Sequence, residues 1–382
     1  MEMVRKNPDQ GEAVSGSGRP GATGKRARAN QLQFLRFLAF CLVFIWHADR
    51  WSFPGLFSGG YGAAGAVACF FMLGGFVTGY SHFNDECAVT LRGIGAYVWR
   101  KLRKVYPLYI FTMLFAVLFT RIPKYITMHQ FEYLKKPLTR LLRNALLIQS
   151  WFPKGYFSFN GVGWFMSTMM FLYLLTLPML ALATRIRRTK RPVLAYCASV
   201  IALSAAAVLY CYILRNTEME YTQYVLPVAR VWEYAAGICL GCLTRCVKPR
   251  LGEPLLARTL TFTAAEAAVF ALWIAAPYKT DYPAWQFRIV HWLLPDILLL
   301  LTFGLGEGLL SALFRARPLV ALGDLTFECF LLHQLVITVY GKFNDYKQAS
   351  PLGNAFMLAF CMLLTLMLSR LIHGTGRPAH IE

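Results

Sequence analysis

An arginine and a histidine lie eleven residues apart in the first long apolar stretch of the chain. Arg36 and His47 enclose ten residues that carry no charge. On an α-helix this spacing makes three turns, so both side chains leave nearly the same face, roughly 16 Å apart along the axis. An arginine at such depth in a bilayer costs about 2.5 to 3.5 kcal/mol on insertion scales and is rarely there without a use. The pair is therefore the first candidate site.

The chemistry open to this pair follows from its residue types. Histidine titrates near neutral pH, so His47 suits a general base that takes a proton from an attacking hydroxyl. It equally suits a nucleophile that carries an acyl group for a short time. Arg36 supplies fixed positive charge, as Arg100 and Arg103 do further along, and guanidinium groups pair well with phosphates. Arg100 and Arg103 are equally well explained as charges that anchor a helix end in the cytoplasm.

The composition indicates that membrane helices must position these residues. Hydrophobic residues make up 57% of the 382 residues and charged residues 15%, a balance far from that of an ordinary soluble domain. We therefore expect an all-α integral membrane protein, with about ten transmembrane helices in one bundle. The predicted spans are 31–49, 61–81, 105–120, 163–183, 193–214, 229–246, 259–277, 288–306, 319–340 and 351–372.

The lysine and arginine residues indicate the orientation, because short loops rich in them stay in the cytoplasm. Basic clusters at Arg100–Lys104 and Arg185–Arg191 follow the second and fourth predicted spans. Both lie inside if the amino terminus is cytoplasmic. Residues 121–162, which this topology places outside, still hold seven basic residues. Their amphipathic stretch 138–152 predicts a helix that lies on the outer surface or folds over the bundle as a lid.

The chain divides into three segments by composition. Residues 1–30, rich in Gly, Ser, Ala and Arg, are expected to form a disordered basic cytoplasmic tail. The transmembrane domain occupies 31–374, and 375–382 form a short cytoplasmic tail. The net charge of +20 does not favour nucleic-acid binding, because the basic residues are dispersed over loops rather than gathered on one domain.

Three cysteines have a spacing that resembles a set of metal ligands. Cys239, Cys242 and Cys246 fall on a predicted helix beside the packing motif Gly237-x-x-x-Gly241. A zinc site normally needs four ligands from a folded knuckle, and cysteines inside membrane helices act as small apolar residues. We therefore predict no metal site.

Three ordered blocks resemble the acyltransferase 3 family of integral membrane acyltransferases, which includes bacterial O-antigen and peptidoglycan O-acetylases. The family's arginine, ten residues and histidine in the first helix are matched by Arg36 and His47. Its Phe-Phe-x-x-Ser-Gly-Phe block is matched at 70–76, with Gly74 in place of serine. Its Arg-x-x-Arg motif, which runs into an aromatic residue and a proline, is matched at 100–107. The resemblance covers nearly the whole membrane domain.

A fourth block, VGWFMSTMMFLYLL, is similar to the family's Trp-x-Leu-x-x-Glu-x-x-x-Tyr pattern. Trp164 and Tyr173 are in place, and the resemblance implies that both line the acceptor site or channel. Met169 stands where many members have glutamate. The substitution leaves one acid or orienting group unaccounted for. Trp164 is also explained as an aromatic anchor at the start of a span.

Two further blocks are similar to family patterns and add candidates that line the acceptor site or channel. Arg230 and Glu233 in ARVWEYAAG match an Arg-x-x-Glu block, and His333 matches a block that ends in histidine. Arg230 and Glu233, three residues apart, form either a structural ion pair or part of the substrate site. His333 either orients the acceptor or bonds a backbone carbonyl.

The resemblance implies a membrane-bound acyltransferase with no tightly bound cofactor. Its co-substrate would be cytoplasmic acyl-CoA, with acetyl the expected group, and its acceptor a hydroxyl of a cell-surface or lipid-linked glycan. Arg36 with Arg100 and Arg103 would bind the donor, while His47 with Arg36 would form the catalytic pair. The separation of this pair, roughly 16 Å, is of the order of an extended pantetheine arm. The partners expected are the donor, the glycan and the lipids of the plasma membrane.

Two other functions compete with this interpretation. A multi-span transporter or flippase of a glycan or lipid precursor would also use many helices and buried charges. The sequence lacks the evident inverted repeats and the paired broken helices that favour such a protein. A non-catalytic scaffold would leave the cost of burying Arg36 and His47 unexplained.

Overall fold

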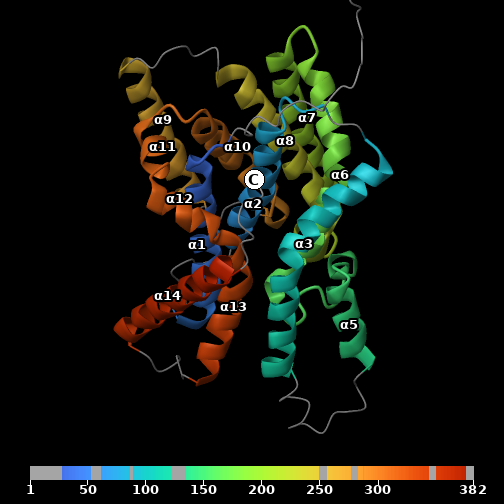
Figure 1. Ribbon diagram of the computed structural model, residues 1–382, viewed down its shortest axis with the longest axis vertical. Coiled ribbons are helices and arrows are strands. Elements are labelled where there is room, and N and C mark those ends of the chain that lie inside the picture. The colour runs from blue at the N-terminus through green and yellow to red at the C-terminus, as the bar shows by residue number, and fades with distance from the viewer. Residues whose placement is uncertain are drawn as a thin grey trace, which may run out of the picture.

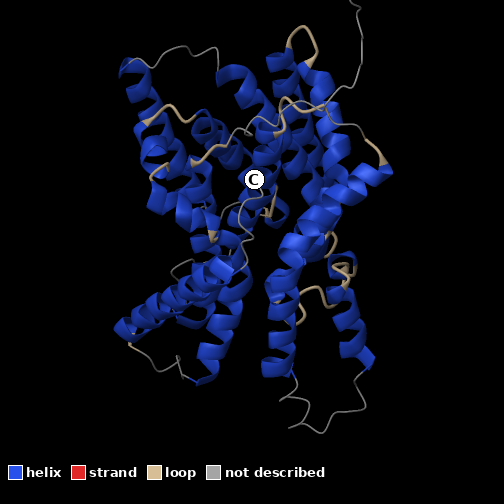
Figure 2. Cartoon of the chain, viewed as in Figure 1, coloured by secondary structure: helices blue, strands red, loops and turns tan. Residues whose placement is uncertain are grey.

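The computed structural model describes residues 28–52, 62–86, 89–121, 135–248, 256–276, 283–286, 288–343 and 350–375. Helices joined by turns and loops make up this part of the chain, and no β-strand occurs within it (Figure 2). The predicted all-α fold is confirmed. The expected tails lie almost wholly outside the described residues. The long helices are α1 (Gln31–Ser52), α2 (Gly62–Ser81), α3 (Leu91–Ala116), α6 (Trp164–Arg187), α7 (Pro192–Ile213), α8 (Val231–Val247), α9 (Leu256–Ala275), α10 (Val290–Leu305), α13 (Thr326–Phe343) and α14 (Pro351–Thr375).

Eight described helices are long and apolar enough to cross a membrane, or nine if the bent pair α12 (Arg317–Asp324) and α13 forms one span. The sequence predicts about ten spans, and the difference lies in α8. This helix occupies the predicted sixth span but has only 17 residues, fewer than the roughly 20 that usually cross a bilayer. Every residue from Ala236 to Thr244 is buried. Other helices therefore enclose α8 on all sides.

The centre of the bundle is the contact between α2 and α8, where two backbones touch. A Cβ atom placed on Gly75 would lie 2.0 Å from the Tyr234 carbonyl oxygen, and one on Gly237 would lie 2.0 Å from that of Met72. Only glycine fits at such a crossing, so the predicted small-residue motif does pack helices. Figure 1 shows α1 and α2 in the middle, with α6 to α8 on one side and α9 to α12 on the other.

The third span begins earlier than its hydropathy predicts. The prediction starts it at residue 105, whereas α3 begins at Leu91, with the Thr90 side chain accepting a hydrogen bond from the Gly93 amide at 3.0 Å. The first turns of α3 carry basic residues on an exposed side, which lowers the mean hydropathy there and hides the helix. Arg100 and Arg103 therefore lie on a helix rather than in a loop.

A buried carboxylate organises the chain after α10. This helix ends at Leu305 and is capped by Gly306, whose φ of +67° places it in the left-handed region that favours glycine. The Glu266 side chain of α9 then accepts hydrogen bonds from the Gly308 and Ser311 amides at 3.1 and 3.0 Å, at the start of α11 (Leu309–Phe314). These amides have no partner within the helix, so Glu266 caps it. The chain continues through α12, which is bent by 59° from α13.

The predicted amphipathic helix over 138–152 is confirmed only for its first half, because α5 (Lys135–Ala145) ends at Ala145 and a loop held by hydrogen bonds follows. Helix α5 is followed by Leu147 in the left-handed region. The loop then contacts α13 through two hydrogen bonds. The side-chain amide of Asn160 donates to the Leu331 carbonyl at 2.9 Å, and the backbone amide of Val162 donates to the side-chain oxygen of Gln334 at 3.0 Å. The loop is therefore attached to the part of α13 that contains His333.

Candidate active site

One unbroken helix presents both residues of the first candidate pair. Helix α1 runs from Gln31 to Ser52, so Arg36 and His47 leave nearly the same face, roughly 16 Å apart along the axis. Both side chains are half-buried. Helix α1 contacts α2, α12, α13 and α14. The His47 end lies against His333 of α13, whereas the Arg36 end lies near Asp324 of α12.

At the His47 end, two histidines from distant parts of the sequence meet. The Nε2 atom of His333 lies 3.4 Å from the Nδ1 atom of His47, and the two ring centroids are 5.0 Å apart at nearly right angles. His333 is fully buried on α13. The family pattern identified both residues separately, and the structure places them side by side.

The hydrogen bonds define which nitrogen of each ring carries a proton. The Nδ1 atom of His47 lies 2.9 Å from the Val43 carbonyl, and Nδ1 of His333 lies 2.8 Å from the Phe330 carbonyl. A carbonyl only accepts, so each Nδ1 is the donor and the lone pair of each neutral ring lies on Nε2. The His333 Nε2 therefore accepts from the His47 Nδ1–H. This arrangement makes Nε2 the basic nitrogen of His47.

Aromatic rings surround the two histidines. Phe40 and Phe44 of α1 lie 5.5 and 6.2 Å from the His333 ring centroid, and Phe330 lies 5.9 Å from it. The Trp46 ring packs edge-on against His47 at 4.7 Å. These rings pack against both imidazoles and hold them in place, which a general base or nucleophile requires.

At the other end of α1, Arg36 has polar neighbours from three elements. Its guanidinium donates to the Gln33 side chain at 3.1 Å. Tyr173 of α6 and Asp324 of α12 lie close enough to act on its charge. Tyr173, expected beside the acceptor or channel, thus lies on the Arg36 side of the bundle.

The basic residues of α3 do not all face the same way. Arg100 and Arg103 are exposed, and the Arg100 guanidinium lies 5.5 Å from the Tyr97 ring centroid. Lys101 instead turns inward, with its ammonium 5.4 Å from the Tyr97 ring and 5.7 Å from the Tyr173 ring. The residue of α3 that approaches the Arg36 region is therefore Lys101. Its spacing of four residues from Tyr97 was the available signal in the sequence.

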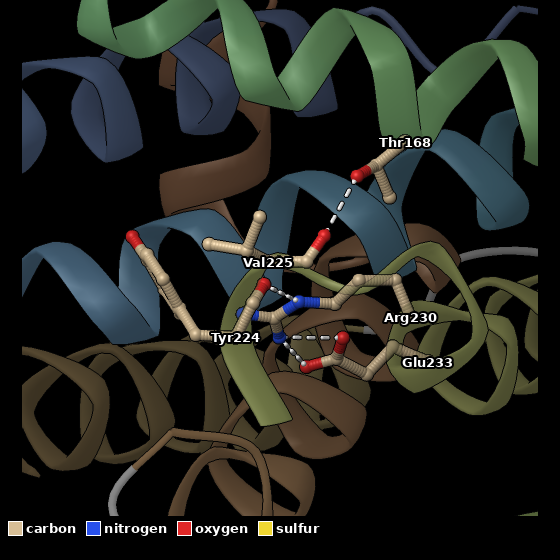
Figure 3. Close-up of polar contacts among 5 residues, drawn as sticks. All are labelled: Thr168, Tyr224, Val225, Arg230 and Glu233. Carbon is tan, nitrogen blue, oxygen red and sulfur yellow. Dashed lines mark hydrogen bonds and ion pairs between the residues drawn. The ribbon is translucent and has the colours of Figure 1, made fainter. Parts of the chain in front are cut away.

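Arg230 and Glu233 form a buried ion pair at the start of α8 (Figure 3). The Arg230 Nη1 atom donates to both carboxylate oxygens, at 3.0 and 2.8 Å, and its Nε donates to the Tyr224 carbonyl at 2.9 Å. The guanidinium also lies over the rings of Tyr224 and Phe71, at 4.9 and 5.2 Å. Its Nη2 atom is buried without an acceptor among the described residues. The pair thus anchors this turn and leaves one donor for a water or ligand.

Trp164 begins α6 within an aromatic cluster. Its ring lies 4.8 Å from Tyr224 and 6.1 Å from Phe71, so it shares both neighbours with Arg230. Phe157 of the preceding loop, which is exposed over 39% of its surface, lies 6.5 Å away. The rings thus connect the exposed loop with the buried Arg230. Trp164 itself is almost fully enclosed, so it contacts protein rather than the lipid surface.

Gly74 and Met169, the two departures from the family pattern, are neighbours in space. A Cβ atom on Gly74 would lie 3.9 Å from the Met169 methyl group and 3.6 Å from the Tyr234 ring. A serine and a glutamate at these two places would be close together. This chain has replaced both by residues without a polar side chain, so neither is left unpaired in the core.

Two further acidic residues have structural partners. Asp296 accepts from the Trp273 indole at 2.9 Å, and Glu328 pairs with His373 at 2.8 Å. In the described residues no three His, Cys, Asp or Glu side chains form a cluster that could hold a metal ion.

A family model described as an acyltransferase domain matches residues 30–372, and this range includes both histidines, all the arginines named above and the α2–α8 core. The chain belongs to the acyltransferase 3 family. Searches of curated proteins and of solved structures found no significant match. Together with the apolar helices, family membership makes this a multi-pass membrane protein and a membrane acyltransferase.

Proposed function

We propose that this acyltransferase moves an acetyl group from cytoplasmic acetyl-CoA to a hydroxyl of a cell-surface or lipid-linked glycan, at the plasma membrane. The observation that supports this most is the contact between His47 and His333. His47 lies on the same helix as Arg36, three turns from it. A base and a cation so separated match a donor that is bound at one end of the bundle and reacts toward the other.

In the proposed reaction His47 is the general base. Its Nε2 takes the proton of the acceptor hydroxyl as the oxygen attacks the thioester carbonyl. The carbon–sulfur bond then breaks, and the proton passes from His47 to the departing thiolate. The products are an O-acyl ester and free CoA. His333 accepts from the His47 Nδ1–H throughout, which keeps the imidazole oriented and stabilises the imidazolium.

The donor would bind at the Arg36 end. Arg36 and Lys101 supply charge around Tyr173, and the exposed Arg100 and Arg103 add charge outside them. Acyl-CoA carries several negative charges, which this set would attract. Tyr173 would line the path of the donor arm.

The acceptor would approach from the opposite end. Trp164 and Tyr224 offer ring faces, Arg230 has a buried donor without a protein acceptor, and Glu233 holds that guanidinium in place. Sites for small ligands combine apolar walls with a few fixed polar groups in this way. The loop that precedes α6 is bonded to α13 one residue from His333, so it would control access to the histidines.

The test compares the O-acetyl groups on the surface glycans of producing cells with those of cells that lack the gene, by mass spectrometry and NMR. The wild-type gene is expected to add O-acetyl groups. His47→Ala and Arg36→Ala are expected to abolish them while the protein remains inserted at normal abundance. Trp99→Ala is a matched control, since Trp99 is a large side chain of α3 that is exposed over 62% of its surface. Retained O-acetylation in the His47→Ala strain would refute the proposal.

A further inference from the structure

A cavity of about 560 Å³ lies at the bend between α12 and α13, beside the last turns of α14. Its walls combine apolar side chains with two basic groups and one acidic group. The lining residues are Pro318, Ala321, Leu322, Asp324, Leu325, Arg370, His373 and Gly374. None of these residues belongs to the histidine site described above.

Among the described charged residues that line this cavity, Arg370 is the one whose side chain can bind a ligand. Asp324 pairs with Arg28 at 3.9 Å, and His373 pairs with Glu328 at 2.8 Å. Both carboxylates therefore already have a basic partner. Arg370 is exposed in the cavity wall, and no described residue forms a hydrogen bond or ion pair with it. A guanidinium in that state suits a phosphate, to which it can donate two parallel hydrogen bonds.

The cavity lies on the Arg36 side of the bundle. A Cβ atom on Gly323 would touch the Gln33 carbonyl, so the end of α12 lies against the first turn of α1. Arg36 donates a hydrogen bond to the Gln33 side chain and interacts electrostatically with Asp324. The cavity therefore lies next to the first turns of α1, which contain Gln33 and Arg36.

Helix α13 leads from this cavity to the histidines. Leu325 lines the cavity and directly precedes α13, and His333 follows eight residues later within that helix. At 1.5 Å per residue the distance along the axis is about 12 Å. A flexible arm that starts in the cavity and follows α1 and α13 past Arg36 would place its end near His47.

We propose that this cavity binds the phosphorylated adenosine end of the acyl-CoA donor, with Arg370 on the phosphates and the apolar wall of α12 against the purine. The inference rests on the proposed function and adds to it the place where the nucleotide binds. It also separates two tasks of the donor site: the cavity binds the nucleotide, and Arg36 contacts the arm that carries the thioester.

The test uses two donors that differ only in the nucleotide, acetyl-CoA and acetyl-pantetheine. Detergent-permeabilised membranes of producing cells supply both the full-length protein and its own acceptor, and transfer of labelled acetyl to the glycan fraction is measured. Arg370→Gln is expected to raise the KM for acetyl-CoA about tenfold, as loss of a charged hydrogen bond does, and to leave the KM for acetyl-pantetheine within twofold. Arg370→Lys, which keeps the charge, is expected to restore most of the affinity for acetyl-CoA.

Arg185→Gln is the matched control, because Arg185 is exposed near the end of α6 and does not line the cavity. The inference is overturned if Arg370→Gln leaves both KM values unchanged, or if it raises both equally. An equal rise would assign the cavity a structural or lipid-binding role instead. Wild-type membranes that transfer acetyl from neither donor would refute the proposed function itself, which is a different result.

Discussion

Substitution of His333 tests whether this residue orients the proposed base, His47. His333→Leu removes the acceptor of the His47 Nδ1–H while nearly keeping the side-chain volume among Phe40, Phe44 and Phe330. His333→Gln restores an acceptor at the position of Nε2. His47→Ala removes the base itself.

The expected loss of activity depends on the His47 Nδ1–H group, which has two acceptors, the Val43 carbonyl and the His333 Nε2. The Val43 carbonyl lies at 2.9 Å from the His47 Nδ1 and keeps this nitrogen the donor even without His333. The bond to His333 is 3.4 Å, longer than an ordinary bond, so it contributes no more than the typical value of about 1 kcal/mol. His333→Leu should therefore lower kcat by no more than about fivefold, because 1 kcal/mol corresponds to that factor. His47→Ala should lower it by roughly 10² to 10⁴, the contribution of general-base catalysis.

The assay is the transfer of labelled acetyl from acetyl-CoA to the glycan fraction of permeabilised membranes, normalised to the amount of folded protein. Fluorescence-detected size exclusion after heating measures folding. We expect activity to decrease in the order wild type, His333→Gln, His333→Leu, His47→Ala. A hundredfold loss in a well-folded His333→Leu protein would refute the orienting role, and would indicate that His333 itself transfers the proton or carries the acyl group.

Three further sets of substitutions test the packing that positions the site. Met169→Glu should lower the thermal midpoint by placing a carboxyl in the core without a partner, and Gly74→Ser should recover part of the loss in the double variant, with a coupling of about 0.5 to 3 kcal/mol. Removal of one member of the buried pair, by Arg230→Met or Glu233→Gln, should cost about 3 to 5 kcal/mol, whereas Arg230→Met with Glu233→Leu should cost less than either single change. Gly237→Ala should destabilise the bundle by about 1 to 3 kcal/mol or more, because its Cβ would lie 2.0 Å from a carbonyl oxygen of α2.

All three are measured as heat-induced loss of the monodisperse peak in size exclusion. Gly95→Ala is the control for the glycine, since a Cβ at Gly95 meets no atom within 4 Å. Additive effects of Gly74→Ser and Met169→Glu would contradict their proximity. A double Arg230/Glu233 variant less stable than both single variants would show that the pair stabilises the fold in its own right.

The candidate pair Arg36 and His47 could be predicted because it depends on one helix. The helical period relates residues eleven apart, and the cost of charge in an apolar segment marks them as candidates for a functional site. Long apolar segments likewise predicted most of the spans. The start of α3 was missed because its first turns are amphipathic and basic, and α8 falls short of a full span because it has only 17 residues.

Contacts between helices could not be predicted in the same way. His47 and His333 are 286 residues apart, and whether they meet depends on how α1 and α13 are rotated and crossed. The inward turn of Lys101 and the contact between Gly74 and Met169 depend on the same kind of rotation. When a helix is apolar on all sides, the sequence contains no period that reports which face a neighbour covers.

The sequence by itself determined the all-helical membrane fold, the family and the residues able to do acyl chemistry, because hydropathy, helical spacing and side-chain type are local properties. Only the tertiary structure decided which of these residues lie together: a second histidine beside the first, an arginine paired with a glutamate inside the core, and a cavity at the Arg36 end of the bundle. The physical reason is that backbone contact at glycines such as Gly237 determines how the helices cross. That crossing determines which side chains meet.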